Sequence, residues 1–494
     1  MTDVVLAVDQ GTSSTRCFVV DAALDIVAVA SRPVDTSFPR SGWVEQDPNQ
    51  IVRSVIEAVA EAVDRAEIRW DDVRGIGIDN QTETFVVWDR ETGAPIYPAI
   101  VWQCRRTAAE CDRLREAGRE PLVRRLTGLE LDASFSATKL AWVLENVEGA
   151  RKAAEAGHLA FGDVASWLVW RLSDGRAHVT EPSNASRSML MGLVGLGWDD
   201  ELLDLFSIPR SMLPEIRSSA SVLAETSPGV IGAAVPLAGA LGDQQAALFG
   251  QQCWEPGMAK LTLGTGAFVW ANAGPTPPVP PQGILGTCAW RLDGETAFAL
   301  EGFVPVAGAA LSWLVEVGVL DAPEASEALA RGAGTDDDVW FVPALTGLGA
   351  PTWNPDARGV VVGLHLGVSR GQLVRAALDG VVHQVADAVE AMDAGAPAPL
   401  ERLRVDGGMA RNDWLMQRLA DVLGRPVERP ANTEATGIGA ASVAGLTVGM
   451  WSGREELRER WRLERRFDPS TDEERRRQDR DRWREALAVA TGWS

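Results

Sequence analysis

Lysine and cysteine are both scarce in this chain, and their scarcity excludes several kinds of site. Among 494 residues only Lys139, Lys152 and Lys260 are lysines, and none of them follows a glycine. A P-loop requires a Gly-Lys-Ser/Thr run, so that phosphate site is excluded. The five cysteines form no Cys-x-x-Cys pair. Such an unpatterned set favours a reducing compartment, and we expect the protein in the cytoplasm.

Other absences narrow the function further. The four histidines lie far apart and form no zinc motif. No His-Arg-Asp or Asp-Phe-Gly triplet is present, which excludes the protein-kinase fold. The net charge of −22 argues against nucleic acid or an anionic membrane as a partner. Because the N-terminus lacks a basic segment before an apolar one, and no apolar run could span a bilayer, we expect neither a signal peptide nor membrane insertion.

The first apolar run of the chain ends in a short polar stretch. Residues 4–15 read VVLAVDQGTSST, and Arg16 follows. One interpretation is a β-hairpin, because Gly11 permits a tight turn and the hydroxyls bind loose backbone groups. The other is a phosphate site, in which backbone N–H groups and hydroxyls bind anionic oxygens and Asp9 holds a metal ion. The stretch alone leaves both interpretations open, and the hairpin is the commoner one.

The pattern of strand, glycine turn and strand returns half a chain later. It occurs at 258–271, MAKLTLGTGAFVWA, and a third glycine turn lies at 405–412. Apolar runs at 74–79 and 84–89 are typical of central strands, and helical patterns occur at 49–65 and 371–392, so the two kinds of element alternate along the chain. This alternation predicts an α/β fold. Because the chain is too long for one core, we expect two similar domains facing a cleft, residues 1–246 and 247–494.

Two other stretches are assigned a packing or a surface role. Gly437-Ile438-Gly439 lacks the remainder of a dinucleotide fingerprint, so its glycines are interpreted as small residues in a tightly packed helix. The stretch 454–488 is densely charged with both signs, which favours an exposed helical face.

Together the motifs resemble those of the FGGY family of carbohydrate kinases, and of the glycerol kinases within it. The resemblance extends from residue 4 to residue 451. In chain order the matching motifs are SGWVEQDP (41–48), AIVWQCRRTA (99–108), SFSATKLAW (134–142), VTEPSNASRSML (179–190), GDQQAALFGQ (242–251), LTGLGAPTWNPDARG (345–359) and DGGMARNDWLMQ (406–417). The resemblance implies an α/β fold of two actin-like ATPase domains, each ribonuclease-H-like, around a central catalytic cleft. It also implies transfer of the γ-phosphate of ATP, with Mg²⁺, to a terminal hydroxyl of a small polyol or sugar.

The resemblance also assigns the nucleotide site. In the first domain, Thr12, Ser13 and Ser14 would hold phosphate oxygens, Arg16 would offset their charge, and Asp9 would hold Mg²⁺. In the second domain, the residues implied to contact the nucleotide are Gly264, Thr265, Gly266, Gly308, Ser312, Gly408 and Asn412. Ser312 stands where glycerol kinases usually have glutamine, which loosens the expected recognition of the base.

For the acceptor site, the resemblance implies a base and an orienting amide. Asp243, in the GDQQ motif, would accept the proton of the acceptor hydroxyl as phosphate is transferred. Gln244 would orient the same acceptor, and Glu83 and Trp102 would contact it. An isolated Gly-Asp is more often a turn, and it is the surrounding family motif that favours catalysis here.

Two positions depart from the glycerol kinase pattern. Thr82 stands in place of an arginine and Ser134 in place of a tyrosine, both of which would contact glycerol. Because a guanidinium and a phenol are replaced by short hydroxyl side chains, the pocket is expected to be wider. We therefore expect a four- or five-carbon polyol or related ketose as acceptor. The alternative is that glycerol remains the substrate and water fills the gaps.

Other function classes share this fold, which alone cannot choose among them. A chaperone-like ATPase would not need Glu83, Trp102 and Asp243 together, and a non-catalytic sugar sensor would not need an intact nucleotide site. Residues 227–241 carry no basic residue where glycerol kinases inhibited by fructose 1,6-bisphosphate have an arginine, so we expect no such inhibition. The family analogy allows a homodimer or a homotetramer.

Overall fold

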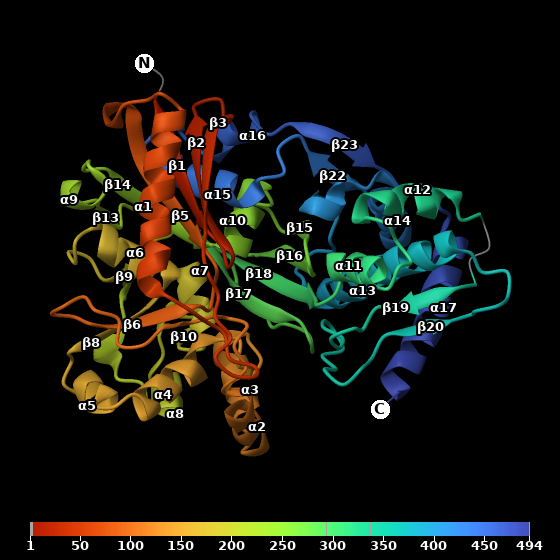
Figure 1. Ribbon diagram of the computed structural model, residues 1–494, viewed down its shortest axis with the longest axis horizontal. Helices are drawn as coiled ribbons and strands as arrows, with labels where there is room; N and C mark the ends of the chain where they lie inside the picture. The colour runs from red at the N-terminus through yellow and green to blue at the C-terminus, as the bar shows by residue number, and fades with distance from the viewer. Residues whose placement is uncertain (1–2, 293, 335–337, 494) are drawn as a thin grey trace.

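The computed structural model describes residues 3–292, 294–334 and 338–493, which form two α/β halves (Figure 1). The first half contains a mixed six-stranded sheet, in the order β13 (Ala224–Glu225), β14 (Pro236–Gly242), β5 (Val73–Asn80), β1 (Val4–Gln10), β2 (Ser14–Asp21) and β3 (Ile26–Pro33). β1 is antiparallel to β2 and parallel to β5. Every residue of β1 is buried, as its unbroken apolar run predicts for a central strand. The predicted hairpin is therefore confirmed.

Helix α1 (Pro48–Arg65) packs on β1, β2 and β3. It begins after Asp47, whose side chain accepts a hydrogen bond from the backbone N–H of Asn49, and Pro48 occupies the first helical turn. Its buried apolar residues recur at helical spacing, at Ile51, Val52, Val55, Val59, Ala62 and Val63. The helix predicted at 49–65 is confirmed.

The rest of the first half is built on smaller sheets and short helices. An antiparallel sheet has the order β4 (Glu45–Gln46), β7 (Ala99–Ile100), β6 (Phe85–Asp89) and β8 (Leu159–Asp163). The strand pairs are β9 (Val179–Thr180) with β12 (Glu215–Ile216), and β10 (Met191–Gly192) with β11 (Gly197–Trp198). The helices are α2 (Ala108–Glu116), α3 (Glu120–Thr127), α4 (Ser136–Asn146), α5 (Ala150–Glu155), α6 (Val164–Leu172), α7 (Pro182–Ala185), α8 (Asp200–Phe206) and α9 (Pro228–Ile231).

The second half repeats the central arrangement of the first. Its seven-stranded sheet has the order β17 (Leu285–Leu292), β18 (Glu295–Val304), β16 (Ala267–Gly274), β15 (Met258–Leu263), β21 (Arg402–Asp406), β22 (Val427–Pro430) and β23 (Leu463–Phe467). β15 is antiparallel to β16 and parallel to β21, as β1 is to β2 and β5. The repeated strand–turn–strand pattern of the sequence thus corresponds to equivalent positions in two sheets, and the predicted α/β class is confirmed.

The second half also contains several helices and a further strand pair. They are α11 (Gly308–Glu316), α12 (Ser326–Gly332), α13 (Arg370–Gly395), α14 (Asp413–Leu423), α16 (Arg454–Arg458) and α17 (Glu473–Gly492), and β19 (Trp340–Val342) pairs with β20 (Val360–Val362). None of the helices in the described ranges combines the length and the apolar character needed to cross a membrane.

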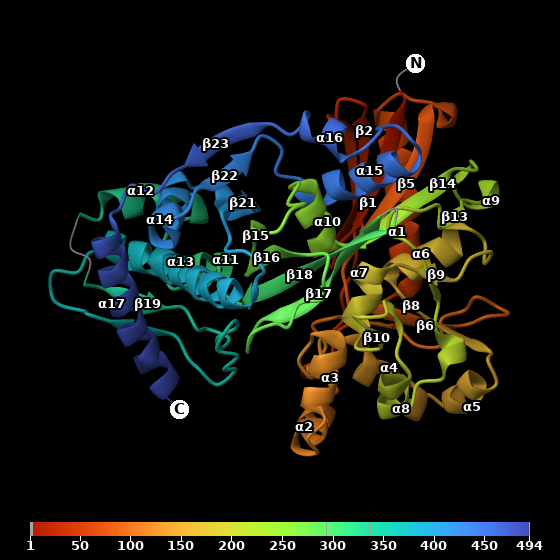
Figure 2. The same cartoon turned by 180° about the vertical axis from the view of Figure 1, so that it is seen from behind.

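Two helices from distant parts of the sequence pack together between the halves (Figures 1 and 2). They are α10 (Asp243–Gly250) and α15 (Ala435–Thr447), and α15 also packs on β1, β5 and β14. A Cβ atom on Gly439 would lie 1.9 Å from the carbonyl oxygen of Ala246, so only glycine fits there. The prediction of small residues in a tightly packed helix is confirmed. The expected domain boundary at 246 falls inside α10.

The prediction for the charged tail is only partly right. The stretch 454–488 contains the strand β23 as well as helices, and it is not simply an exposed face. Trp483 and Arg480 of α17 are buried, and Arg480 donates hydrogen bonds to Glu390 and to Asp387 of α13. The charges of this helix therefore form buried ion pairs as well as solvent contacts, which the mixed composition did not distinguish.

Candidate active site

A cavity of about 320 Å³ lies between the two halves. All six predicted acceptor-site residues line it: Thr82, Glu83, Trp102, Ser134, Asp243 and Gln244. The structure thus brings together residues that are up to 162 positions apart in sequence. The second half contributes Phe268, Leu285, Glu301, Phe303 and Trp353 to the same cavity. Any molecule bound there would contact both halves.

Asp243 is held at the start of α10, directly after β14. Its Oδ1 accepts a hydrogen bond of 2.7 Å from the backbone N–H of Gln244. Burial, followed by repulsion from Glu83, raises the pKa of Asp243 to about 7. A carboxylate with such a pKa can accept a proton near neutral pH, which is the requirement for a general base.

The amide of Gln244 is oriented by a buried lysine. Lys260 of β15 donates from Nζ to Oε1 of Gln244 at 2.5 Å and to Oγ1 of Thr262 at 2.9 Å. Because the amide oxygen accepts from Lys260, the amide nitrogen remains as the donor of Gln244. Burial lowers the pKa of Lys260, opposed by the negative charges of Asp406 and Asp243.

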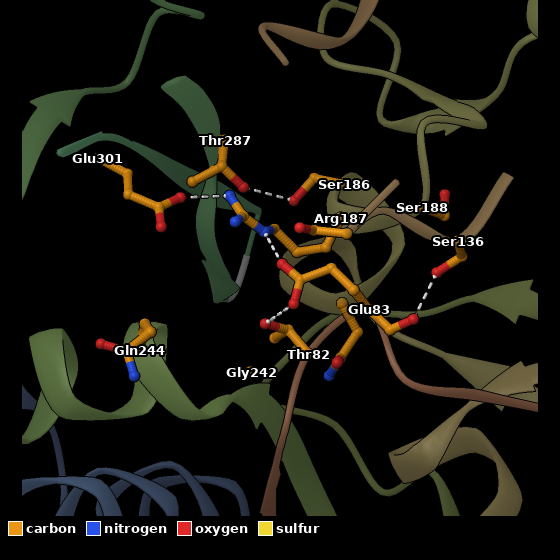
Figure 3. Close-up of polar contacts among 12 residues, drawn as sticks. Thr82, Glu83, Ser136, Ser186, Arg187, Ser188, Gly242, Gln244, Thr287 and Glu301 are labelled. Atoms are coloured by element: carbon orange, nitrogen blue, oxygen red, sulfur yellow. Dashed lines mark hydrogen bonds and ion pairs between the residues drawn. The ribbon is translucent and has the colours of Figure 1, made fainter. Parts of the chain in front are cut away.

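Glu83 is fixed in both its backbone and its side chain (Figure 3). Its φ of 63° lies in the left-handed region, which is uncommon for a residue with a side chain. Its backbone oxygen accepts from Ser136 at 3.0 Å. Its carboxylate accepts from Arg187 Nε at 2.6 Å and from Thr82 Oγ1 at 2.8 Å. The carboxylate therefore has one defined orientation at the surface of the cavity.

The two positions that depart from the family pattern lie at the cavity, but their hydroxyls are engaged. Thr82 donates to Glu83, as above, and Ser134 Oγ donates to Asp132 Oδ1 at 2.6 Å. Each hydroxyl oxygen can still accept a hydrogen bond. Guanidinium groups nevertheless reach the same cavity from other positions, because Arg105 and Arg187 both line it.

Trp102 connects the acceptor cavity to the hydroxyl-rich turn. Its indole Nε1 donates to Thr12 Oγ1 at 3.0 Å, and Thr12 also lines the cavity. Gln46 donates to the backbone oxygen of Thr12 at 2.6 Å. The turn between β1 and β2, with Ser13 and Ser14, thus ends beside this cavity.

Buried carboxylates gather at the ends of β1 and β5. Asp9 and Asp79 are partners across the parallel strands, and Asp9 Oδ2 lies 2.5 Å from Arg16, which also contacts Glu434 at 2.5 Å. Within the described ranges, neither carboxylate oxygen of Asp79 has a hydrogen-bond partner. Burial, followed by repulsion from Asp9 and Asp243, raises the pKa of Asp79 well above its usual range. Burial also raises the pKa of Asp9, opposed by Arg16.

Among the described residues no group of three or more carboxylate, histidine or cysteine side chains is arranged to hold a metal ion, so a divalent cation here would be held by Asp9 and Asp79 together with other oxygen ligands. Hard oxygen ligands are those that Mg²⁺ prefers, and a cation would relieve the repulsion between the carboxylates. The orphaned oxygens of Asp79 are therefore the observation in favour of a metal ion next to Asp9.

The predicted nucleotide residues of the second half lie mainly around the start of α11. Gly264 N donates to Gly266 O at 2.9 Å, and the backbone oxygen of Thr265 accepts from Ala307 at 2.9 Å. Gly308 N donates to Gly264 O at 2.9 Å, and a Cβ on Gly308 would lie 2.6 Å from that oxygen. Close approach of these backbones therefore requires glycine at 308.

The other three nucleotide residues are arranged around this loop. Ser312 is exposed on α11, and its Oγ donates to Gly308 O at 3.3 Å. Gly408 and Asn412 follow β21, where Asn412 is the N-cap of α14 and accepts from Leu415 N at 2.9 Å. Met409, between them, has its sulfur near the site of a Cβ on Gly308.

Among the charged residues of the site that the sequence reasoning missed are Asp79, Lys260, Arg187 and Glu301. Asp79 ends an apolar run on an acid, as Asp9 does, and that signal was available. Lys260 interrupts an apolar strand, which is a signal for a functional or paired charge. Arg187 lies inside the family motif at 179–190 and Glu301 lies outside the quoted motifs, and nothing in the spacing of either placed it beside Glu83.

Comparison with known proteins gives matches over the whole chain. Residues 4–250 match the N-terminal domain model, and residues 259–448 the C-terminal domain model, of the FGGY family of carbohydrate kinases. The chain is 46% identical to glycerol kinase 2 of Thermotoga maritima over 490 residues, covering 99% of both chains. It is 50% identical to the glycerol kinase of Aromatoleum aromaticum, again covering 99% of both. The crystal structure of Plasmodium falciparum glycerol kinase with ADP has a TM-score of 0.95 and 31% identity, covering 99% of this chain and 98% of that one.

Proposed function

This chain belongs to the FGGY family of carbohydrate kinases, as a member of the glycerol kinase type, and we propose that its acceptor is a four- or five-carbon polyol or the related ketose. Family membership makes it an ATP-dependent phosphotransferase that uses Mg²⁺. The acceptor is inferred from the cavity. The observation that carries the proposal is a cavity of about 320 Å³ with Thr82 and Ser134 on its surface.

The size of the cavity favours an acceptor longer than glycerol. The cavity of about 320 Å³ extends from Thr12 and Trp102 to Glu130 and Trp353, so it is not confined to the length of a three-carbon acceptor. Because loose placement of the reacting hydroxyl costs rate, the longer acceptor would be positioned better. The free acceptor sites on Thr82 and Ser134 would bind its additional hydroxyls.

In this proposal Asp243 is the catalytic base. It accepts the proton of the terminal hydroxyl as the oxygen of that hydroxyl forms its bond to phosphorus. Glu83 accepts a hydrogen bond from a neighbouring hydroxyl, and the amide nitrogen of Gln244 donates one to the acceptor. The indole of Trp102 packs against the carbon chain. Together these contacts align the acceptor before transfer, which is the main protein contribution to phosphoryl transfer.

The charges of the nucleotide are balanced by residues of both halves. Asp9, with Asp79 beside it, would hold Mg²⁺, which neutralises phosphate charge when bound. The hydroxyl turn Thr12, Ser13 and Ser14 would bind phosphate oxygens, as would the backbone at 264–266. Arg16, which forms ion pairs with Asp9 and Glu434, would add positive charge next to the phosphates. The adenosine part would lie near Gly308, Ser312, Gly408 and Asn412.

A second candidate acceptor is glycerol itself. It is favoured by the relatives that are 46% and 50% identical, both of which are named glycerol kinases. A non-catalytic ATPase or sugar sensor is disfavoured, because such a protein has no use for a base of raised pKa in an acceptor cavity. All five cysteines are unpaired and buried, which supports action in the cytoplasm.

The test is the release of ADP from MgATP with a panel of acceptors, with Asp243→Asn as the inactive control. We expect the highest kcat/KM with a four- or five-carbon compound such as erythritol, ribitol, xylitol or xylulose. The highest value with glycerol would contradict the proposed acceptor and leave the kinase class intact. ADP release that is independent of every acceptor would support the non-catalytic classes instead.

A further inference from the structure

Arg187 forms an ion bridge from one half of the protein to the other (Figure 3). It lies in the 3-10 turn η2 (Ser186–Ser188), between α7 and β10. Its Nε donates to Glu83 Oε1 at 2.6 Å, and its Nη1 lies 2.7 Å from Glu301 Oε2 on β18. Glu83 belongs to the first half and Glu301 to the second. The guanidinium thus joins an acceptor-site carboxylate to the opposite side of the cavity.

All three charges of this bridge are removed from water. The side chains of Arg187, Glu83 and Glu301 are only 6%, 8% and 6% exposed. Burial alone would lower the pKa of Arg187, but the carboxylates of Glu301 and Glu83 raise it. A buried ion cluster is weak support for stability, because desolvation offsets much of the attraction. Its position at the cavity favours a role in the geometry of the site.

The residue before Arg187 makes an uncharged contact between the two halves. Ser186 Oγ and Thr287 Oγ1, of β17, are 2.7 Å apart and share a hydrogen bond. Glu83 itself has a φ of 63°, in the left-handed region that residues with a side chain adopt only uncommonly. The direction of the Glu83 carboxylate is set by its hydrogen-bond partners, Thr82 and Arg187. Of these two partners, Arg187 is the one that carries a charge.

Building on the kinase function proposed above, we propose that Arg187 is a positioning residue for the acceptor. It holds Glu83 so that the carboxylate presents one orientation to an acceptor hydroxyl. Through Glu301 it does so only while the two halves are together. The planar fork of a guanidinium suits this role, since it can serve two carboxylates from fixed directions, which an ammonium group cannot.

Two conservative variants test the positioning role. Arg187→Lys keeps the charge but loses the fork, and Glu301→Gln removes the anchor charge with little change of volume. For Arg187→Lys we expect the acceptor KM to rise by about ten- to a hundredfold, as for lost hydrogen bonds between charged groups. We expect a smaller rise for Glu301→Gln. The KM for ATP should stay within about twofold in both, because neither residue belongs to the nucleotide site.

A matched control separates positioning from stability. Asp379 pairs with Arg418 Nε at 2.6 Å in a largely buried ion pair that lies outside the cavity. Asp379→Asn should lower the melting temperature without changing the acceptor KM. If Arg187→Lys shows the same pattern as this control, Arg187 is merely structural and the inference is overturned.

A double-mutant cycle tests whether Arg187 acts through Glu83. In the Glu83→Gln background, adding Arg187→Lys should change the acceptor KM by no more than about twofold. A full additional rise would show that Arg187 acts independently of Glu83, and would overturn the inference. Wild-type protein with no acceptor-dependent ADP release would instead overturn the proposed function. An active wild type whose acceptor KM is unchanged by Arg187→Lys would overturn only the role of Arg187.

Discussion

The proposed widening of the acceptor cavity can be tested by one substitution, Ser134→Tyr. Ser134 lines the cavity of about 320 Å³, and its hydroxyl donates to Asp132 Oδ1 at 2.6 Å. The change adds six non-hydrogen atoms, which occupy on the order of 100–200 Å³ if each takes up to one water volume. The remaining space would be much too small for a five-carbon polyol and would be closer to the size of glycerol. The hydrogen bond to Asp132 is also lost, at a cost of about 1 kcal/mol.

The expected result is a change of preference rather than a loss of activity. A misfit of one or more chain atoms is worth about 1–3 kcal/mol, so kcat/KM for a five-carbon acceptor should fall roughly 10–200-fold relative to glycerol. ADP release measured with glycerol, erythritol and ribitol gives this ratio. Ser134→Ala is the control, because it removes the same hydrogen bond without filling space. If Ser134→Tyr lowers all acceptors equally, or matches Ser134→Ala, the argument from cavity volume is refuted.

Three further results are expected. The value of kcat/KM for the acceptor should fall as the pH drops below about 7. The reason is that Asp243, whose pKa is raised to about 7, must be ionised to accept a proton. A pH profile that is flat down to about pH 5 would argue against Asp243 as the base. Lys260→Met should raise the acceptor KM about tenfold, because Gln244 loses the donor 2.5 Å from its amide oxygen, and an unchanged KM would show that other contacts orient the amide. Gly439→Ala should destabilise the fold by about 1–3 kcal/mol or more, since its Cβ would lie 1.9 Å from a carbonyl oxygen of α10. Gly332→Ala, where a Cβ meets nothing within 4 Å, should leave the melting temperature nearly unchanged, and equal behaviour of the two variants would contradict the packing argument.

Features set by neighbouring residues could be predicted from the sequence. The apolar run at 4–10 predicts a buried strand, and Gly11 with its flanking polar residues predicts the turn that follows it. The helices at 48–65 and 370–395 follow from the spacing of apolar residues. The repeated strand–turn–strand pattern even indicated that two sheets share one arrangement. Local chemistry and periodicity are sufficient for such features because they involve contacts between residues close in the chain.

The electrostatics of the site depended on topology that the sequence did not reveal. Asp79 lies beside Asp9 because β5 runs parallel to β1, and parallel strands are not joined by a short turn. Arg187 meets Glu83 across 104 positions, and Glu301 only through the second sheet. The side-chain substitutions in the acceptor site were recognised from the family pattern. The guanidinium that reaches the same cavity from another part of the chain was not.

The hydrogen-bond partners of the buried lysines differ from those of Arg187. Lys152 is exposed, but Lys139 and Lys260 are completely buried, which is rare for lysine. Lys139 donates to the backbone oxygens of Val101 and Ser134 at 3.3 and 2.6 Å, and burial lowers its pKa to about 8. Both buried lysines thus support acceptor-site residues through neutral oxygens.

At Arg187 the partners are two carboxylates on opposite sides of the cavity, and there the cation is a planar fork. A compact ammonium group can turn its three donors toward single oxygens in a confined space, whereas a guanidinium can bridge two anions in fixed directions. A lysine at position 187 is therefore expected to hold the two carboxylates in less fixed directions, which is the effect that the Arg187→Lys variant measures.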